Sequence, residues 1–263
     1  MRFRVRHLAR YRYDAPVALG PHVVRLTPRA GAGMSHGIRV TPEPAFRRDE
    51  VDLHGNRITR LGFEGLTNAL VIESRFELET RGVPAASGEA ARAETYLKKG
   101  ADAPGIAATA ARLRALAGPD PEAFAESLAA TLHAAIRHDP DDTAPLRAPG
   151  DTLARGRGSR RDIAGLFVEL SRRAGLPARF VSGYWAESVH PASPRSLHSW
   201  PEVRLAEGGW QGFDPTLGTR AGEGHVALAA APDLSGTVPI TGSTYGAGIP
   251  VSTDFELTIL TPG

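Results

Sequence analysis

The sequence predicts an α+β fold, with strands toward both ends of the chain and helices grouped between them. Residues 1–80 alternate apolar and polar side chains between turn residues, which is typical of antiparallel strands. Residues 106–136 and 161–174 instead place apolar side chains at helical spacing. From residue 178 onward, β-rich runs are separated by Gly and Pro. Because the helices are grouped rather than alternating with single strands, we do not expect βαβ units.

The first part of the chain predicts a small antiparallel β domain. Its clearest alternation places four apolar side chains on one face of a strand: Leu70, Ile72, Phe76 and Leu78. Gly55 and Asn56 form a turn signal between two further strand-like runs. We therefore assign residues 1–80 to an N-terminal β domain. Residues 81–104, rich in Ala, Gly, Pro and charge, form a linker, and residues 105–263 form the core.

The core is expected to be organised around the amphipathic helix at 161–174, packed on an antiparallel sheet. Five apolar residues mark the buried face of this helix: Ile163, Leu166, Phe167, Leu170 and Ala174. Gly175 is a candidate C-cap, and Pro177 follows where the helix cannot continue. The first turn of such a helix presents unpaired N–H groups and the positive end of the dipole. It therefore favours a thiolate or another anion.

Further motifs lie on both sides of this helix. Residues 11–26 precede it, and four stretches follow it: His198-Ser-Trp-Pro-Glu-Val203, Gly209-Trp-Gln-Gly-Phe-Asp-Pro-Thr216, Ala221-Gly-Glu-Gly-His-Val226 and Pro239-Ile-Thr-Gly242. In this order they resemble the transglutaminase-like superfamily, whose fold is related to that of papain-like cysteine proteases. Residues 11–26 are similar to the β-rich region that precedes the core in bacterial members. The resemblance implies a transglutaminase-like (papain-like) core behind an N-terminal antiparallel β domain.

Members of this family place a nucleophilic cysteine at the start of the central helix, in a Gly-x-Cys-x-Asp pattern. Here Gly158 and Asp162 match the ends of the pattern, and Arg160 occupies the cysteine position. The chain contains no cysteine anywhere. The resemblance therefore implies that the nucleophile has been lost.

The resemblance also implies that His198 and Asp214 correspond to the family's base and its orienting carboxylate. Beside a thiol, such a pair would withdraw the thiol proton. Without a thiol, the two residues are vestigial triad positions, or they form only a structural cross-strand hydrogen bond. Ser159 is the hydroxyl beside Arg160. It is either an N-cap, which serine favours strongly, or a nucleophile activated by a base.

Arg160 faces the positive end of the helix dipole, so its charge needs an offsetting partner. It belongs to a basic cluster with three neighbours: Arg155, Arg157 and Arg161. The cluster binds an acidic group, such as a glutamate side chain or a C-terminal carboxylate, or it is a solvated loop held by internal salt bridges. Two aromatic residues of the predicted strands, Tyr184 and Trp200, either pack in the sheet or line the site. The candidate binding residues are thus Ser159, Arg161, Tyr184 and Trp200.

Composition excludes several classes of function. The formal charge is +2, from 31 basic and 29 acidic residues, which does not indicate a nucleic-acid-binding protein. Without cysteine there is no disulfide, thiol catalysis or cysteine-ligated metal. We expect no cofactor, and the spacing of His190 and His225 relative to His198 does not indicate a zinc site. The first residues lack the apolar segment of a signal peptide, and no run approaches membrane-spanning length, so we expect a cytoplasmic protein without membrane contact.

These observations lead to two functional hypotheses. The first is a pseudoenzyme that keeps a cleft for a peptide or for an acidic or amide ligand. Bacterial relatives can be joined to, or act beside, amide-ligase-type proteins of the ATP-grasp or amidoligase kind, so the resemblance implies a scaffold or substrate-presenting subunit. The alternative is an active amidohydrolase, peptidase or acyl transferase that uses His198 and Asp214 with Ser159 or an activated water.

Overall fold

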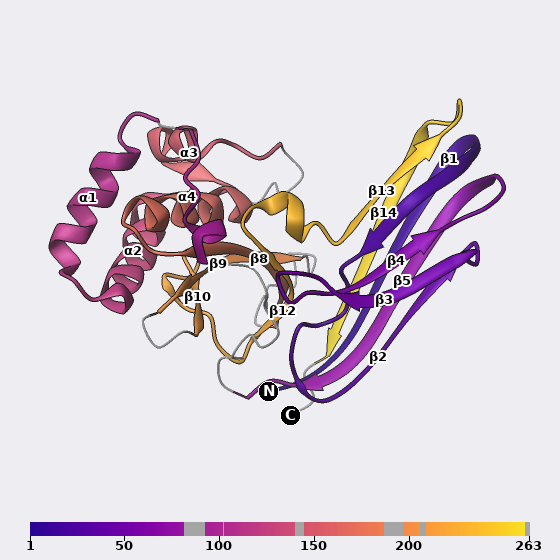
Figure 1. Cartoon of the computed structure of the whole chain (residues 1–263), viewed down its shortest axis with the longest axis horizontal. Helices are drawn as coiled ribbons and strands as arrows, with labels where there is room; N and C mark the ends of the chain where they lie inside the picture. The colour runs from indigo at the N-terminus through magenta and orange to yellow at the C-terminus, as the bar shows by residue number, and fades with distance from the viewer. Residues whose placement is uncertain (82–92, 102, 140–144, 187–196, 206–208, 261–263) are drawn as a thin grey trace.

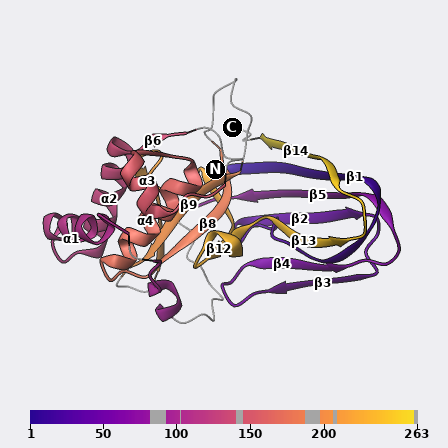
Figure 2. The same ribbon diagram turned by 90° about the horizontal axis from the view of Figure 1, so that it is seen from above.

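The computed structural model describes residues 1–81, 93–101, 103–139, 145–186, 197–205 and 209–260. It consists of a long β unit and a core unit that combines helices with a second sheet (Figure 1). Seen from above as well, the sheet of the core unit lies between its helices and the β unit (Figure 2). This arrangement confirms the α+β class expected from the sequence.

The β unit is built around its first strand. Its members are β1 (Arg2–Val24), β2 (Ala32–Thr41), β3 (Phe46–Val51), β4 (Arg57–Gly62), β5 (Thr67–Glu79), β13 (Ile240–Tyr245) and β14 (Pro250–Leu260). The first half of β1 pairs antiparallel with β5 and β14, and its second half pairs antiparallel with β4 and β13. Strand β2 extends the sheet beyond β5, and β3 extends it beyond β4. One long strand therefore holds the whole unit together.

The two C-terminal strands lie in the β unit rather than in the core unit. The division drawn from the sequence placed residues 105–263 together, yet β14 pairs with β1 from Arg4↔Leu260 to Tyr13↔Pro250. Alternating side chains identify a strand and its buried face, but they do not identify the neighbour that completes its hydrogen bonds. The β unit is therefore made from both ends of the chain.

The two units share buried contacts. Tyr184 and Val226 from the core unit join the apolar cluster of the β unit. Asn56, which is fully buried, makes a pair of hydrogen bonds with the backbone of Ala230. Its Nδ2 donates to the carbonyl oxygen at 2.9 Å, and its Oδ1 accepts from the N–H at 2.7 Å. These contacts fix the sheet of the core unit against the β unit.

Among its described residues, the core unit places four helices on one side of a five-stranded sheet (Figure 1). The helices are α1 (Ile106–Ala117), α2 (Pro121–Ala135), α3 (Pro149–Arg155) and α4 (Arg160–Arg173), with the 3₁₀ turns η1 (Ala93–Leu97) and η2 (Leu234–Thr237). The sheet has the order β11 (Thr219–Arg220), β10 (Trp210–Asp214), β9 (His198–Arg204), β8 (Ala178–Trp185) and β12 (His225–Ala231). A short parallel pair, β6 (Arg137–His138) and β7 (Arg157–Gly158), precedes α4.

Helix α4 confirms the helix expected at 161–174. Its N-terminus carries a capping box between Ser159 and Asp162. At its C-terminus Gly175 has a φ of 83°, and its N–H donates to Arg172 while the N–H of Leu176 donates to Ser171. These two bonds are the Schellman pattern that ends a helix. The helix is therefore fixed at both ends by local sequence.

Candidate functional site

Helix α4 runs along β9 in the same direction as the strand. The Arg172 guanidinium, in the last turn, donates to the carbonyl of Ala178 at 2.9 Å, and Ala178 pairs with Val203 near the end of β9. Earlier in the helix, Phe167 stacks on Phe213 with ring centroids 5.8 Å apart. The first turn of α4 therefore lies toward the start of β9, where His198 stands.

Asp214, at the end of β10, is the centre of a buried hydrogen-bond network. Its Oδ2 lies 2.5 Å from His198 Nε2 and 3.1 Å from His225 Nε2. Its Oδ1 accepts from the backbone N–H of Thr216 at 2.9 Å and from the Thr216 hydroxyl at 2.5 Å. The carboxylate is fully buried and the two imidazoles are nearly so. Both of its oxygens therefore have two hydrogen-bond partners.

These partners determine the charge of the network. Burial alone would raise the pKa of Asp214, but hydrogen bonds from His198, His225 and Thr216 outweigh it and hold that pKa well below its ordinary value. An ionised carboxylate only accepts hydrogen bonds, so His198 and His225 both donate through Nε2–H. The sequence-based pairing of His198 with Asp214 is thus present as a direct contact.

The other nitrogen of His198 is the exceptional atom of the site. His198 Nδ1 is buried and has no hydrogen-bond partner among the described residues. A buried polar atom without a partner costs about 1–3 kcal/mol. In the described part of the chain, neither the Ser159 hydroxyl nor the Arg160 guanidinium is hydrogen-bonded to Nδ1.

Aromatic rings enclose the two imidazoles. Trp185 lies over His198 with centroids 5.7 Å apart, and Trp200 meets His225 edge-on at 5.1 Å. The sheet admits the Trp200 indole because Gly183 and Gly212 lack side chains. A Cβ at Gly183 would lie 2.7 Å from the indole, and one at Gly212 would lie 3.2 Å from its nitrogen. The rings shield the hydrogen bonds of Asp214 from water, which strengthens them.

Ser159 is committed to the start of α4. Its hydroxyl accepts from the Asp162 N–H at 3.3 Å, and Asp162 Oδ2 accepts from the Ser159 N–H at 2.9 Å. Arg147 binds the same carboxylate through its own N–H at 2.8 Å and through its guanidinium at 2.9 Å. This geometry matches the N-cap alternative for Ser159.

The four arginines of the basic cluster lie in different environments. Arg157 forms an ion pair with Asp139 at 2.8 Å, as the salt-bridge alternative expected. Arg160 and Arg161 are half-buried in the first turn of α4, and Arg155 is exposed. Their roles as binding residues stay predictions.

The two aromatic candidates, Tyr184 and Trp200, are both buried inside the protein. Tyr184 is fully buried, and its hydroxyl is 2.9 Å from Nδ1 of His7 in the β unit. Trp200 is 2% exposed and packs with Val181, Ala221 and Ala230. Both placements favour packing over binding, which was one of the two readings that the sequence left open.

His225 is the residue that the sequence did not assign to the site. Its motif was visible, but the spacing between His198 and His225 gave no sign that β12 would carry it to Asp214. His198, Asp214 and His225 bring ligand atoms within 4.8 Å of one another, so a metal must be considered. However, His225 Nδ1 accepts from the Gly222 N–H at 3.2 Å, which requires the proton on Nε2.

That proton argues against metal ligation. A metal-bound histidine donates through its second nitrogen to an acceptor, whereas His225 faces a donor there. The donor set therefore fits a hydrogen-bond network rather than a metal centre. His190, the other histidine considered for zinc, lies outside the described residues.

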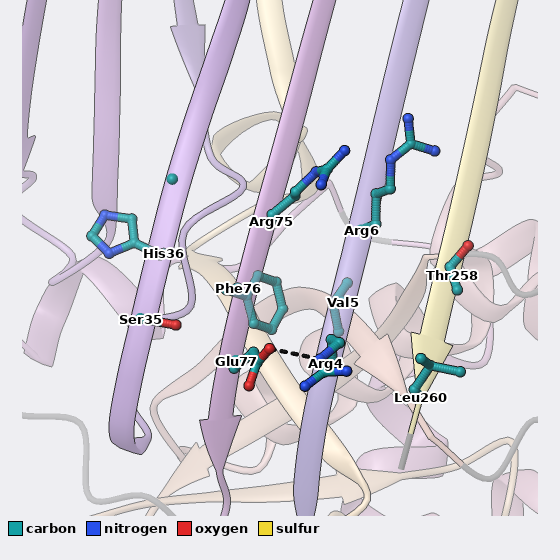
Figure 3. A pocket seen from close by; sticks show the side chains of 11 residues that line it. Arg4, Val5, Arg6, Ser35, His36, Arg75, Phe76, Glu77, Thr258 and Leu260 are labelled. Atoms are coloured by element: carbon teal, nitrogen blue, oxygen red, sulfur yellow. Dashed lines mark hydrogen bonds and ion pairs between the residues drawn. The ribbon is translucent and has the colours of Figure 1, made fainter. Parts of the chain in front are cut away.

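A separate hollow of about 510 Å³ lies on the outer face of the β unit, over β2, β5, β1 and β14 (Figure 3). Its guanidiniums pair with acidic side chains on the same strand or on a neighbouring one. Arg4 contacts Glu77 at 2.6 Å, and Arg6 and Arg75 contact Glu73 at 2.6 and 2.9 Å. Such exposed pairs form a solvated ladder with little energetic effect. The hollow has none of the buried polar chemistry found around Asp214.

Comparison with known proteins places this geometry in a family. Residues 3–79 match the model of the bacterial transglutaminase-like N-terminal region, and residues 107–215 match the transglutaminase-like superfamily core. The chain belongs to the transglutaminase-like superfamily. The first match runs from β1 to β5 of the β unit. The second runs from α1 through the other helices to strands β8, β9 and β10. Neither match includes β13 or β14.

Three similar proteins come from bacteria. An uncharacterized protein of Mycobacterium leprae is 24% identical over 280 residues, covering 98% of this chain and 97% of that protein. An uncharacterized protein of Mycobacterium tuberculosis is 25% identical over 276 residues, covering 93% and 88%. The structure of a suspected cysteine protease from Cytophaga hutchinsonii superposes with a TM-score of 0.67 at 17% identity, covering all of this chain and 92% of that one. At this identity the likeness shows a shared fold.

Within the described residues, no helix combines the length and apolar character needed to cross a bilayer. The cytoplasmic location stays a prediction.

Proposed function

We propose that this protein is a non-catalytic member of the transglutaminase-like superfamily that binds a peptide or amide group at His198. The buried Nδ1 of His198, without a partner among the described residues, carries the proposal. A ligand that supplies the missing hydrogen bond removes the cost of leaving this atom unsatisfied. Nδ1 is closed off from solvent, so a ligand reaches it only when a neighbouring side chain moves. Trp185 is half-buried and lies over the ring.

The residues around His198 support binding rather than catalysis. The chain has no cysteine, and Arg160 stands at the position that the family pattern gives to the nucleophile. The Ser159 hydroxyl serves the cap of α4. A base and its orienting carboxylate without a nucleophile retain little of the chemistry of a triad.

Arg160 and Arg161 extend the proposal to a second group on the ligand. Both are half-buried at the first turn of α4, and a guanidinium favours planar pairing with a carboxylate. A peptide with an acidic side chain or a C-terminal carboxylate offers such a group. A binding subunit of this kind would present its ligand to an amide-ligase-type enzyme of the ATP-grasp or amidoligase kind.

The test restores the nucleophile. The Arg160→Cys protein and the parent are assayed on a panel of amide and ester substrates, with Arg160→Ala as the control for loss of the guanidinium alone. We expect turnover only in the cysteine form, at least about a hundredfold above the parent, because His198 and Asp214 remain able to act as a base. Turnover in the parent would contradict a non-catalytic role.

Binding is measured on the same three proteins by titration with end-blocked peptides that carry Gln or Glu. We expect the parent to bind, and Arg160→Ala to weaken only the peptide with the carboxylate. If neither peptide binds the parent, the proposed binding role fails, whatever the activity of the cysteine form.

A further inference from the structure

Two imidazoles share one oxygen of Asp214, and they differ in what their second nitrogen meets. His225 Nδ1 accepts from the Gly222 N–H, so its proton is held on Nε2 and points at Asp214. His198 has no such partner at Nδ1 among the described residues. His225 is therefore locked in one neutral tautomer by backbone, whereas the state of His198 depends on Asp214.

The donor from His225 limits how strongly Asp214 can favour a charged His198. With Thr216 on Oδ1 and both imidazoles on Oδ2, the carboxylate charge is shared among four donors. Removing the His225 donor would leave a lone pair of a fully buried oxygen facing His198 alone. The doubly protonated form of His198 would then become more populated, because an unshared carboxylate charge stabilises an imidazolium more strongly.

We propose that His225 is a positioning residue that keeps His198 neutral with its proton on Nε2, so that Nδ1 accepts a hydrogen bond from an N–H or O–H donor of the ligand. The identity of the ligand rests on the proposed function, whereas the tautomer of His198 rests only on the contacts of Asp214.

The tautomer is tested first, without any ligand. Imidazole ¹⁵N chemical shifts of His198 are recorded at neutral pH in the intact protein and in two variants, His225→Gln and His225→Phe. The glutamine amide can still donate to Asp214, and the phenylalanine ring keeps the packing against Trp185 and Trp200 without donating. We expect a protonated Nε2 and an unprotonated Nδ1 in the parent and in His225→Gln, and added protonation at Nδ1 in His225→Phe.

This pair separates positioning from packing. A role limited to packing predicts the reverse order, with His225→Phe like the parent and His225→Gln perturbed. That result would overturn the inference, as would a protonated Nδ1 in the parent.

The outcomes distinguish the two proposals. Failure of both peptides to bind the parent, with the expected tautomers observed, contradicts the proposed function and leaves the positioning role of His225 supported.

Discussion

Two serines, Ser159 at the N-cap of α4 and Ser171 in its last turn, differ in how their hydroxyl groups are hydrogen-bonded. Ser159 caps the helix through Asp162, whereas the buried hydroxyl of Ser171 has no hydrogen-bond partner among the described residues. The same chemical group therefore stabilises the fold at one position and carries an unmet desolvation cost at the other. The two serines form a natural pair for comparison.

Replacing each serine by alanine should change stability in opposite directions. We expect Ser159→Ala to lower the free energy of unfolding by about 1 kcal/mol, because it removes an N-cap. We expect Ser171→Ala to be neutral or to raise it by a few tenths of a kcal/mol, because alanine is the better helix former and has no hydroxyl to desolvate. Urea unfolding measures both. A Ser159→Ala protein as stable as the parent would contradict the capping role.

At the residue scale, the sequence predicted the pairing of His198 and Asp214 but not the third member of the network. That pairing followed from a family resemblance carried by neighbouring motifs. His225 lies on β12, which is not adjacent to β9 or β10, and it reaches Asp214 only through the order of the sheet. Its function depends on a three-dimensional neighbour, and spacing along the chain does not encode that neighbour.

At the scale of elements, the sheet of the core unit depends on a close approach between β8, β9 and β12. A Cβ at Gly183 would lie 2.1 Å from the carbonyl oxygen of Val226 and 2.7 Å from the Trp200 ring. Neither neighbour can withdraw easily, since one is backbone and the other is a fully packed indole. Gly183 is therefore required for the pairing of β8 with β12.

We expect Gly183→Ala to lower the free energy of unfolding by about 3 kcal/mol or more, because overpacking a buried contact with backbone forces the strands apart. Gly165, in the middle of α4, is the matched control, because nothing lies within 4 Å of the Cβ that alanine would add. Gly165→Ala should raise stability by up to about 1 kcal/mol through helix propensity. Thermal and urea unfolding measure the stability of both variants. Equal effects of the two substitutions would refute the close-contact explanation for Gly183.

Helices of different length were not equally predictable. Helix α4 shows four turns of apolar spacing with cap residues at both ends, and the sequence located it within one residue at each end. Helix α3 has seven residues, begins at Pro149 and ends before Gly156 with a φ of 60°. Two turns give too little periodicity to separate a helix from a polar loop.

At the scale of the whole molecule, the contact between the two units contains a buried histidine. His7 of β1 lies beside Tyr184, and burial lowers the pKa of His7 to about 4 from an ordinary value of 6.5. The folded protein therefore holds His7 neutral at pH values where the unfolded chain would protonate it.

This difference predicts a loss of stability in acid. The contribution of His7 is complete above about pH 6.5, falls as the pH drops toward 4, and changes no further below that. A difference of about 2.5 between the two pKa values corresponds to about 3 kcal/mol. His7→Gln, which cannot titrate, should flatten the dependence of unfolding free energy on pH across this window. An unchanged slope in the variant would show that burial of His7 does not cause it.

The division into units was only partly visible in the sequence. The N-terminal strands and the helical region were recognisable from their periodicities, and family models match residues 3–79 and 107–215. The return of β13 and β14 to β1 was not recognisable, because backbone hydrogen bonds between distant strands leave no local pattern.

The pairing of β1 with both β13 and β14 also has a consequence for how the protein is made. Strand β1 is synthesised long before β13 and β14. One of its backbone edges therefore stays unpaired while the helices and the second sheet are synthesised. Open edges recruit other chains, and long-range pairing forms slowly. The edge of β1 thus remains unpaired until β13 and β14 have been synthesised, and any product that lacks these strands keeps that edge exposed.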